Sequence, residues 1–382
     1  MSGDPALGLY IHWPYCARIC PYCDFNVYRP KGADDLLLAA ILDDLRHWRE
    51  RTGARRLASL HFGGGTPSLM SQQAVADVIE RAEQLWGFTA EAELGLEANP
   101  NDLASFDGFA AAGINRLSVG VQSFQSDVLE RLGRDHGGDA ARSAVEAALK
   151  AVPQVSLDLI YAWEGQSLEN WLGELETALG TGVGHLSPYQ LTIEQNTAFG
   201  KRAERGETLA LEPDDAAAFY ELTDEVASGA GFERYEISNH ARSTAAQSRH
   251  NRLYWEGGDW IGVGPGAHGR LGRSSDGGRI ATEAARRPGE YVQAIKSSRW
   301  GVADEELLSA EDERAERILM GLRLLEGLDL DDLHAATGLG IDEEEAERMI
   351  ATGLLQRDGA RVSLTREGQV LGDAVSMALV PD

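Results

Sequence analysis

The sequence has few cysteines, no long apolar run and a deficit of positive charge. Its 382 residues include 3 cysteines and carry a formal net charge of −26. No apolar run reaches the ~18 residues that would span a membrane, and the N-terminus lacks the basic and apolar segments of a signal peptide. We therefore expect a cytoplasmic protein with one large domain and a smaller one. The acidity argues against nucleic acid and anionic membrane surfaces as partners.

The three cysteines, Cys16, Cys20 and Cys23, lie close together in the run YIHWPYCARICPYCDF. An odd number of clustered thiols argues against a disulfide framework. Zinc takes four ligands, so a zinc site would have to recruit His12, Asp24 or a distant histidine. A cubane iron–sulfur cluster normally takes four cysteines, so three leave one iron open to bind a small molecule. We expect a [4Fe-4S] cluster at these three cysteines.

Strand-like and helix-like segments alternate through the first half of the chain. Alternating strands and helices predict parallel strands with helices outside them, and six such units make a partial barrel. The expected fold class is α/β, a partial TIM-like (β/α)6 barrel with its chemistry at the carboxyl ends of the strands. The expected strands lie within 7–13, 57–62, 93–100, 115–124, 155–162 and 185–193, and the expected helices within 34–51, 71–86, 139–150 and 168–180.

Beyond residue 200 the pattern changes, which divides the chain into a barrel (1–200), an extension (201–301) and a C-terminal domain (302–382). In the extension we expect a helix at 213–230, and then irregular structure over 250–271 that folds back over the barrel. The C-terminal pattern predicts three helices, a hairpin and a closing helix, which is a winged-helix-like α domain. Residues 301 to 382 contain 20 acidic residues, 7 arginines and no lysine. Contact with nucleic acid phosphates is therefore implausible, and we interpret this domain as a partner-docking or substrate-gating unit.

The cysteine spacing C-x3-C-x2-C, with an aromatic residue before the last cysteine, resembles the cluster loop of radical S-adenosylmethionine (SAM) enzymes. In those enzymes SAM chelates the open iron, so its polar groups need partners nearby. The glycines of GGGTP follow a strand and leave the backbone open to a ligand. Glu97 and Arg134 suit the ammonium and carboxylate of SAM, because a carboxylate pairs with an ammonium and a guanidinium grips a carboxylate. Gln122 and Asp158 can bond ribose hydroxyls, and Ile160 can flank adenine.

The chain resembles the oxygen-independent coproporphyrinogen III oxidase family over nearly its whole length. The matching motifs include GGGTPS, LEANP, RLSVGVQSF, LDLIYA, YQLTIE, YEISNHA, HNRLYW and GVGPGAHG. The resemblance implies a barrel with a C-terminal helical domain, and a [4Fe-4S] cluster on the cysteine triplet. It also implies that SAM contacts Gly64, Gly65, Thr66, Glu97, Gln122, Arg134 and Asp158.

Two features resemble the heme chaperone branch of this family, called HemW. Phe25 stands where the oxidase has a fourth cysteine. The motif HNxxYW of the chaperones is present as HNRLYW, which implies heme contact through His250, Tyr254 and Trp255. Imidazole is a plausible axial ligand and the aromatic rings offer flat apolar surface to a porphyrin. His12, His240 and His268 are rival ligands.

One loop departs from the family pattern. Where the family usually reads GLPGQT, this chain has Ala162-Trp163-Glu164-Gly165-Gln166-Ser167. The change falls after the fifth strand, close to the ribose site that the resemblance implies. We still expect SAM binding, and the sequence leaves open how this loop affects the affinity and geometry of SAM.

The leading hypothesis is a heme-binding chaperone that uses a [4Fe-4S] cluster and SAM and delivers heme to apoproteins such as respiratory enzymes. Its fold resembles coproporphyrinogen dehydrogenase, and we expect it to lack that activity. The expected partners are heme or another tetrapyrrole, heme-accepting apoproteins, transiently a membrane protein, and a second copy in a homodimer. The alternatives are an oxygen-independent coproporphyrinogen III oxidase and a radical SAM enzyme that acts on another tetrapyrrole.

Overall fold

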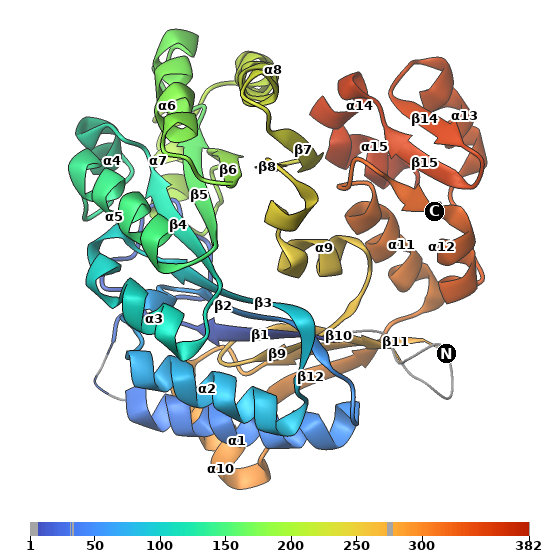
Figure 1. Ribbon diagram of the computed structural model, residues 1–382. Coiled ribbons are helices and arrows are strands. Elements are labelled where there is room, and N and C mark those ends of the chain that lie inside the picture. The colour runs from blue at the N-terminus through green and yellow to red at the C-terminus, as the bar shows by residue number, and fades with distance from the viewer. Residues whose placement is uncertain (1–6, 31, 33, 273–277, 382) are drawn as a thin grey trace.

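A twelve-stranded sheet forms the body of the molecule in this computed structural model, which describes residues 7–30, 32, 34–272 and 278–381 (Figure 1). The strand order is β12-β11-β10-β9-β1-β2-β3-β4-β5-β6-β8-β7. Strands β1 to β6 are parallel, which confirms the predicted partial barrel. These six strands are β1 (Leu7–Trp13), β2 (Leu57–Gly64), β3 (Phe88–Ala98), β4 (Arg116–Gln122), β5 (Gln154–Tyr161) and β6 (His185–Gln190).

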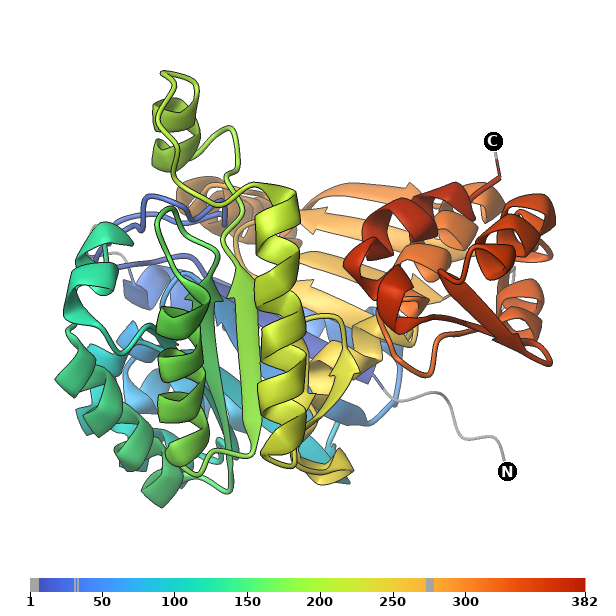
Figure 2. The same cartoon turned by 90° about the horizontal axis from the view of Figure 1, so that it is seen from above.

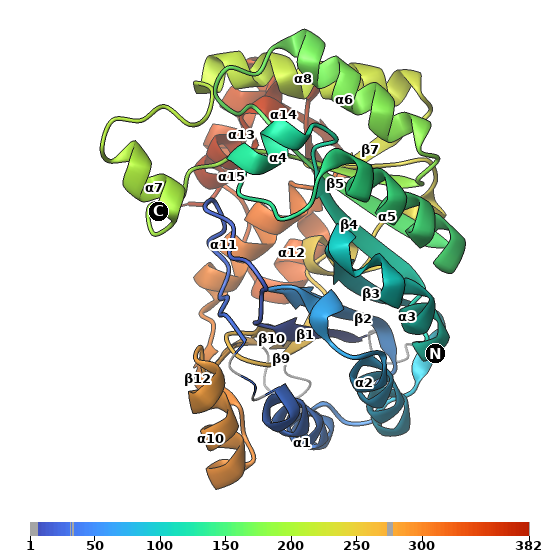
Figure 3. The same cartoon turned by 90° about the vertical axis from the view of Figure 1, so that its left-hand side faces the viewer.

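Helices cover the outer face of these strands, as Figure 3 shows, because each helix carries an apolar stripe that must be buried. In α1 the buried residues recur at helical spacing, as Leu37, Ile41, Leu45 and Trp48. The large core therefore lies between sheet and helices. The helices of this layer are α1 (Asp34–Thr52), α2 (Gln72–Leu85), α3 (Phe106–Ala112), α4 (Ser126–Arg131), α5 (Gly138–Ala151) and α6 (Leu168–Gly180), with short 3-10 helices at Pro67–Leu69 and Pro100–Ser105.

The extension is more regular than the sequence led us to expect. The expected irregular block 250–271 instead holds a helix and two strands, and one of them, β9, pairs in parallel with β1. The expectation was wrong because glycines mask the strand pattern, while Ile261 and Val263 are fully buried core residues. This region comprises α7 (Ala198–Ala203), α8 (Pro213–Gly229), β7 (Glu233–Glu236), β8 (Asn239–Ala241), a 3-10 helix (Thr244–Ala246), α9 (Arg249–Trp255), β9 (Asp259–Val263), β10 (His268–Gly272), β11 (Arg279–Ala284) and α10 (Pro288–Ser298).

Strand β12 (Val302–Leu307) ends the sheet by pairing with β11. The first residues of the segment that we assigned to the C-terminal domain therefore belong to the sheet. Their side chains are mostly exposed, as befits an acidic edge strand.

The C-terminal domain stands beside the barrel with a core of its own (Figure 2). It has the predicted order of three helices and a hairpin, but two short helices stand where one closing helix was expected, and a short strand between the first two helices was not predicted. These elements are α11 (Ala310–Gly321), β13 (Leu328–Asp329), α12 (Leu330–Thr337), α13 (Glu343–Ala351), β14 (Leu355–Asp358), β15 (Arg361–Leu364), α14 (Arg366–Val370) and α15 (Gly372–Ala378). In the part of the chain that the structure describes, no helix has the length and apolar character needed to cross a membrane.

Candidate functional site

A cavity of about 380 Å³ opens at the carboxyl ends of the barrel strands. Every residue that the sequence assigned to the cluster or to SAM contributes to its wall. The structure thus brings together three cysteines, a glycine-rich turn and polar side chains from three further strands. These residues are Cys16, Cys20, Cys23, Gly64, Gly65, Thr66, Glu97, Gln122, Arg134, Asp158 and Ile160.

The cysteine loop after β1 is held from both sides. Its two arms pair through backbone bonds, with Cys16 N donating to Tyr28 O over 2.9 Å and Tyr28 N donating to Pro14 O over 2.7 Å. The Asn26 side-chain amide donates to Pro265 O over 2.9 Å and to Arg286 O over 2.8 Å. The loop therefore depends on backbone that follows β9 and β11, which lies 239 and 260 residues from Asn26 in sequence.

The three thiols suit a multi-iron cluster. All three are free, and burial raises the pKa of Cys16 and brings that of Cys23 to about 11, so both need a cationic partner to ionise. Among the described residues, no three His, Cys, Asp or Glu side chains are gathered closely enough to hold a single metal ion. In a cubane each thiolate binds a different iron, so the ligands stand further apart than around one ion.

The glycine-rich turn after β2 touches the cysteine loop. Gly65 N donates to Trp13 O over 2.7 Å, and a Cβ at Gly65 would lie 2.7 Å from Tyr15 O. Gly64 has a φ of +107°, and a Cβ there would lie 2.5 Å from the His12 ring. Only glycine allows this conformation and this close approach. The turn and the cysteine loop thus form one wall of the cavity.

Two carboxylates line the cavity at different depths. Glu97 accepts weakly from Gly64 N over 3.3 Å and from His61 Nε2 over 3.4 Å. Asp158 accepts from Ser118 Oγ over 3.1 Å, while burial and the nearby Glu97 charge raise its pKa to about 7. The long bonds at Glu97 leave its carboxylate available to a cationic ligand.

Arg134 is placed to bind an anionic group. Its NH1 donates to Cys20 Sγ over 3.3 Å and its NH2 to Gly120 O over 3.1 Å. Among the described residues, its buried Nε has no hydrogen-bond partner. Gln122, at the end of β4, has a φ of +67°, a strained conformation typical of functional sites. Both residues therefore have features that a bound ligand would explain.

The loop that departs from the family pattern is folded tightly beside Ile160. Ala162 has a φ of +63°, which suits glycine better than alanine, and its N–H donates to Gln166 Oε1 over 2.6 Å. Trp163 packs in the small apolar cluster that contains Ile160, and Arg131 lies 5.3 Å from the Trp163 ring centroid. The tryptophan thus fills the space beside the predicted adenine wall.

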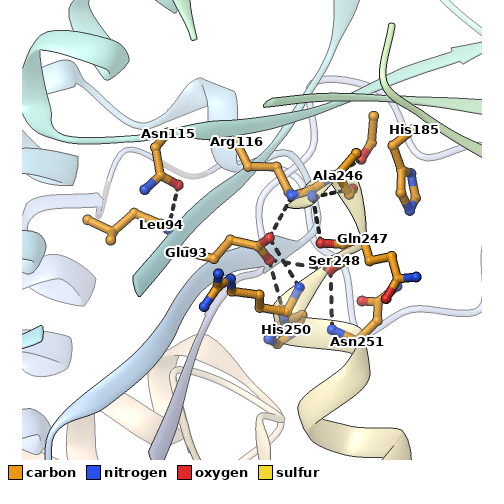
Figure 4. A network of polar contacts seen from close by, with 12 residues as sticks. Glu93, Leu94, Asn115, Arg116, His185, Ala246, Gln247, Ser248, His250 and Asn251 are labelled. Atoms are coloured by element: carbon orange, nitrogen blue, oxygen red, sulfur yellow. Dashed lines mark hydrogen bonds and ion pairs between the residues drawn. The ribbon is translucent and has the colours of Figure 1, made fainter. Parts of the chain in front are cut away.

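Below the SAM positions, at the floor of the cavity, polar contacts join the start of α9 to β3 and β4 (Figure 4). Glu93, on β3, accepts from the backbone N–H groups of Arg249 and His250, each over 3.1 Å. It also pairs with Arg116 Nε over 2.7 Å, in an ion pair that is almost fully buried. Arg116 NH2 in turn donates to Gln247 O over 2.9 Å. A negative charge at the helix N-terminus is stabilising, so this network fixes α9.

The three predicted heme residues lie on α9 and do not line the cavity. The His250 ring is buried and stacks on the His61 ring at 4.2 Å, with Tyr254 at 4.4 Å. Burial lowers the pKa of His250 well below its ordinary value. Arg323 of the C-terminal domain covers the Trp255 ring at 4.5 Å. Ligation of a heme iron by His250 would therefore require α9 to move.

The rival histidines differ in accessibility. His240 is buried, with its Nε2 3.7 Å from Asp224 Oδ1, and His12 Nε2 bonds to Asn26 O over 3.0 Å. His268, at the start of β10, is exposed. Of the rivals, His268 is therefore the histidine that an external ligand can reach without rearrangement.

Several inward-facing residues below the SAM positions were not predicted from the sequence. His61, Arg116, Ser156 and His185 line the deeper part of the cavity, and Ser248 and Asn251 reach it from the start of α9. A period of two along the strands could have found several of them. On β3, for example, Glu93 precedes Glu97 by four residues and so faces the same side.

Comparison with known proteins agrees with this geometry. The Radical SAM superfamily model matches residues 10–178, and the HemN C-terminal domain model matches residues 308–371. The solved coproporphyrinogen III oxidase (HemN) of Escherichia coli superposes with a TM-score of 0.83 at 20% identity, covering 99% of this chain and 90% of that one. At that identity the match establishes the fold.

Curated relatives align over the whole chain. The heme chaperone HemW of Mycobacterium tuberculosis is 37% identical, with 100% of this chain and 96% of the relative aligned. The heme chaperone HemW of Escherichia coli is 37% identical, with 96% of each chain aligned. The mitochondrial radical S-adenosyl methionine domain-containing protein 1 of Mus musculus is 36% identical over 100% of this chain and 88% of its own length.

Proposed function

Because the chain belongs to the HemW family of radical SAM proteins, we propose that it binds a [4Fe-4S] cluster, SAM and heme and acts as a heme chaperone. The observation that carries the first part is the single cavity shared by Cys16, Cys20, Cys23 and the SAM positions. The heme part follows from the names of the relatives. A cytoplasmic location and delivery to apoproteins such as respiratory enzymes belong to the same proposal.

The cavity residues have distinct tasks in this proposal. When bound, a cubane on the three thiolates supplies an open iron that SAM can chelate. Glu97 accepts from the SAM ammonium, and Arg134 donates its unpartnered Nε–H toward the carboxylate. Asp158 and Gln122 bond the ribose, and Ile160 flanks the adenine. Gly64, Gly65 and Thr66 present backbone to the amino acid end, because no side chain blocks the two glycines.

An anaerobic turnover assay separates the chaperone from the oxidase. The protein is reconstituted with iron and sulfide, then given SAM, a low-potential reductant and coproporphyrinogen III. The chaperone proposal expects an intact cluster and no protoporphyrinogen. Formation of 5′-deoxyadenosine together with protoporphyrinogen would make the protein an oxidase. Deoxyadenosine alone would indicate an enzyme that acts on another substrate.

The heme site is tested by titration followed through the Soret band. We expect His250→Ala to weaken heme binding or to change the Soret band. His268→Ala is the matched control, since His268 is a histidine that is already exposed. A change with the control and none with His250→Ala would assign the ligand to β10.

A further inference from the structure

His61 lies between the proposed SAM site and the helix that carries HNRLYW. Its Nε2–H donates to Glu97 Oε1 over 3.4 Å, at the inner end of the cavity. Its ring stacks on His250 at 4.2 Å with an interplanar angle of 7°. One imidazole therefore touches both the carboxylate proposed to hold SAM and the histidine of α9.

A glycine on each of two strands, β2 and β3, leaves the space that this arrangement needs. Gly95 is opposite His61 in the sheet, and a Cβ at Gly95 would lie 2.5 Å from His61 Nδ1. A Cβ at Gly63 would lie 2.9 Å from Glu97 Oε1. The His61 ring and the Glu97 carboxylate therefore pack directly against the backbone of these glycines. Any larger residue at Gly63 or Gly95 would push them apart.

The polar atoms of the stack are poorly satisfied. Within the described chain, the buried Nδ1 atoms of His61 and His250 have no hydrogen-bond partner. The bond from His61 to Glu97 is long, so it is weak. Buried groups with few partners are sensitive to the loss of the partner that remains. A small displacement of the Glu97 carboxylate therefore changes the environment of both imidazoles.

We propose that His61 is a positioning residue that transmits the occupancy of the SAM site to α9. An ammonium on Glu97 draws the carboxylate toward the cavity and away from His61, because a charged donor binds more strongly than the long imidazole bond. His61 then loses its support, its stack with His250 loosens, and α9 opens more often. This inference rests on the proposed SAM site. It gives a route by which the binding of SAM makes the buried HNRLYW motif accessible.

Hydrogen exchange tests the inference on the reconstituted full-length protein. The readout is deuterium uptake of the α9 amides, with and without saturating SAM. We expect SAM to raise their exchange rate by about twofold or more, because local opening sets the rate. The probe 5′-methylthioadenosine lacks the amino acid that Glu97 would bind, so it should leave α9 unchanged. An equal response to both compounds, or none to SAM, would overturn the role of His61.

Two substitutions divide the contacts of His61. His61→Phe keeps the stack and loses the donor, whereas His61→Gln keeps a donor and loses the stack. Both should abolish the response of α9 while the cluster absorbance is retained. A purely structural residue would instead leave the response intact in at least one folded variant. Calorimetry with SAM separates the two hypotheses: absence of binding refutes the proposed SAM site, and binding without a response refutes only the inference.

Discussion

At the rim of the barrel, Glu97, Asp158 and Arg134 face a cavity and keep polar atoms available, whereas at the floor Glu93 and Arg116 are buried and bond to each other and to the chain around them. Glu97 and Glu93 lie four residues apart on the same strand, β3, whereas Asp158 lies on β5, Arg134 after α4 and Arg116 at the start of β4. The rim side chains are placed for a ligand, and the floor side chains serve a helix. Acidic and basic side chains therefore stabilise the fold at the floor, where they are paired. At the rim the same residue types cost stability until a ligand completes their hydrogen bonds.

The largest effect is expected at the floor. Glu93→Ala leaves Arg116 buried without its partner, which typically costs about 3–5 kcal/mol of unfolding free energy. The matched control is Glu91→Ala, because Glu91 pairs with Arg249 on the surface, where a pair contributes ~0–1 kcal/mol. Denaturant unfolding measures both variants. Equal losses would mean that the buried network does not hold α9.

Titration of the rim should give the next largest effect. The Asp158 pKa rises from 3.8 to about 7 in the fold, through burial and the nearby Glu97 charge. Between these pH values only the folded chain keeps the proton, so the unfolding free energy falls as pH rises, by about 4 kcal/mol at ~1.4 kcal/mol per pKa unit, and levels off above pH 7. Asp158→Asn should remove this dependence of the unfolding free energy on pH. A wild-type slope that survives in the variant would assign it to other groups.

Glu97→Gln separates binding from stability. It removes the charge that SAM would bind and also relieves Asp158 of a like charge. We expect SAM affinity to fall about 10- to 100-fold, as for loss of a charge-assisted hydrogen bond. Stability should stay unchanged or rise, in contrast to Glu93→Ala. Calorimetric SAM titration and thermal unfolding test the two halves, and a destabilised variant with intact SAM affinity would reverse the comparison.

The smallest effect is expected at Ala162. Its φ of +63° is unfavourable for alanine, and Ala162→Gly relieves this strain but gives the unfolded chain more freedom. We expect a net gain of ~0.5–1 kcal/mol in stability, with SAM affinity little changed. Thermal unfolding of the two proteins measures it. A loss of stability would mean that packing around Trp163 already compensates for the unfavourable backbone conformation of Ala162.

The sequence predicted the rim better than the floor. Cysteine spacing, glycine runs and strand-end polar residues are local signals, and they led to eleven of the residues that line the cavity. The contact between Glu93 and the start of α9 joins positions more than 150 residues apart, and no local sequence pattern predicts it. The strand β9 was missed for a related reason, because its glycines imitate a loop while its pairing with β1 is set only in the complete sheet.

The heme residues illustrate a further limit. HNRLYW is a motif with an implied ligand, but its burial depends on elements that lie before and after it in the chain. His61 from β2 covers His250, and Arg323 from the C-terminal domain covers Trp255. A motif indicates which chemistry is available, whereas packing decides when that chemistry can be reached.

The position of β1 in the sheet has a consequence for biosynthesis. Strand β1 precedes both β2 and β9 in the chain but lies between them in the sheet, and Asn26 in its cysteine loop bonds to the carbonyls of Pro265 and Arg286. Contacts so distant in sequence form slowly. The cysteines are therefore translated well before the residues that hold their loop in place, so they remain exposed in the nascent chain. Insertion of the proposed cluster should therefore be a late event in maturation, after residue 286 has been translated.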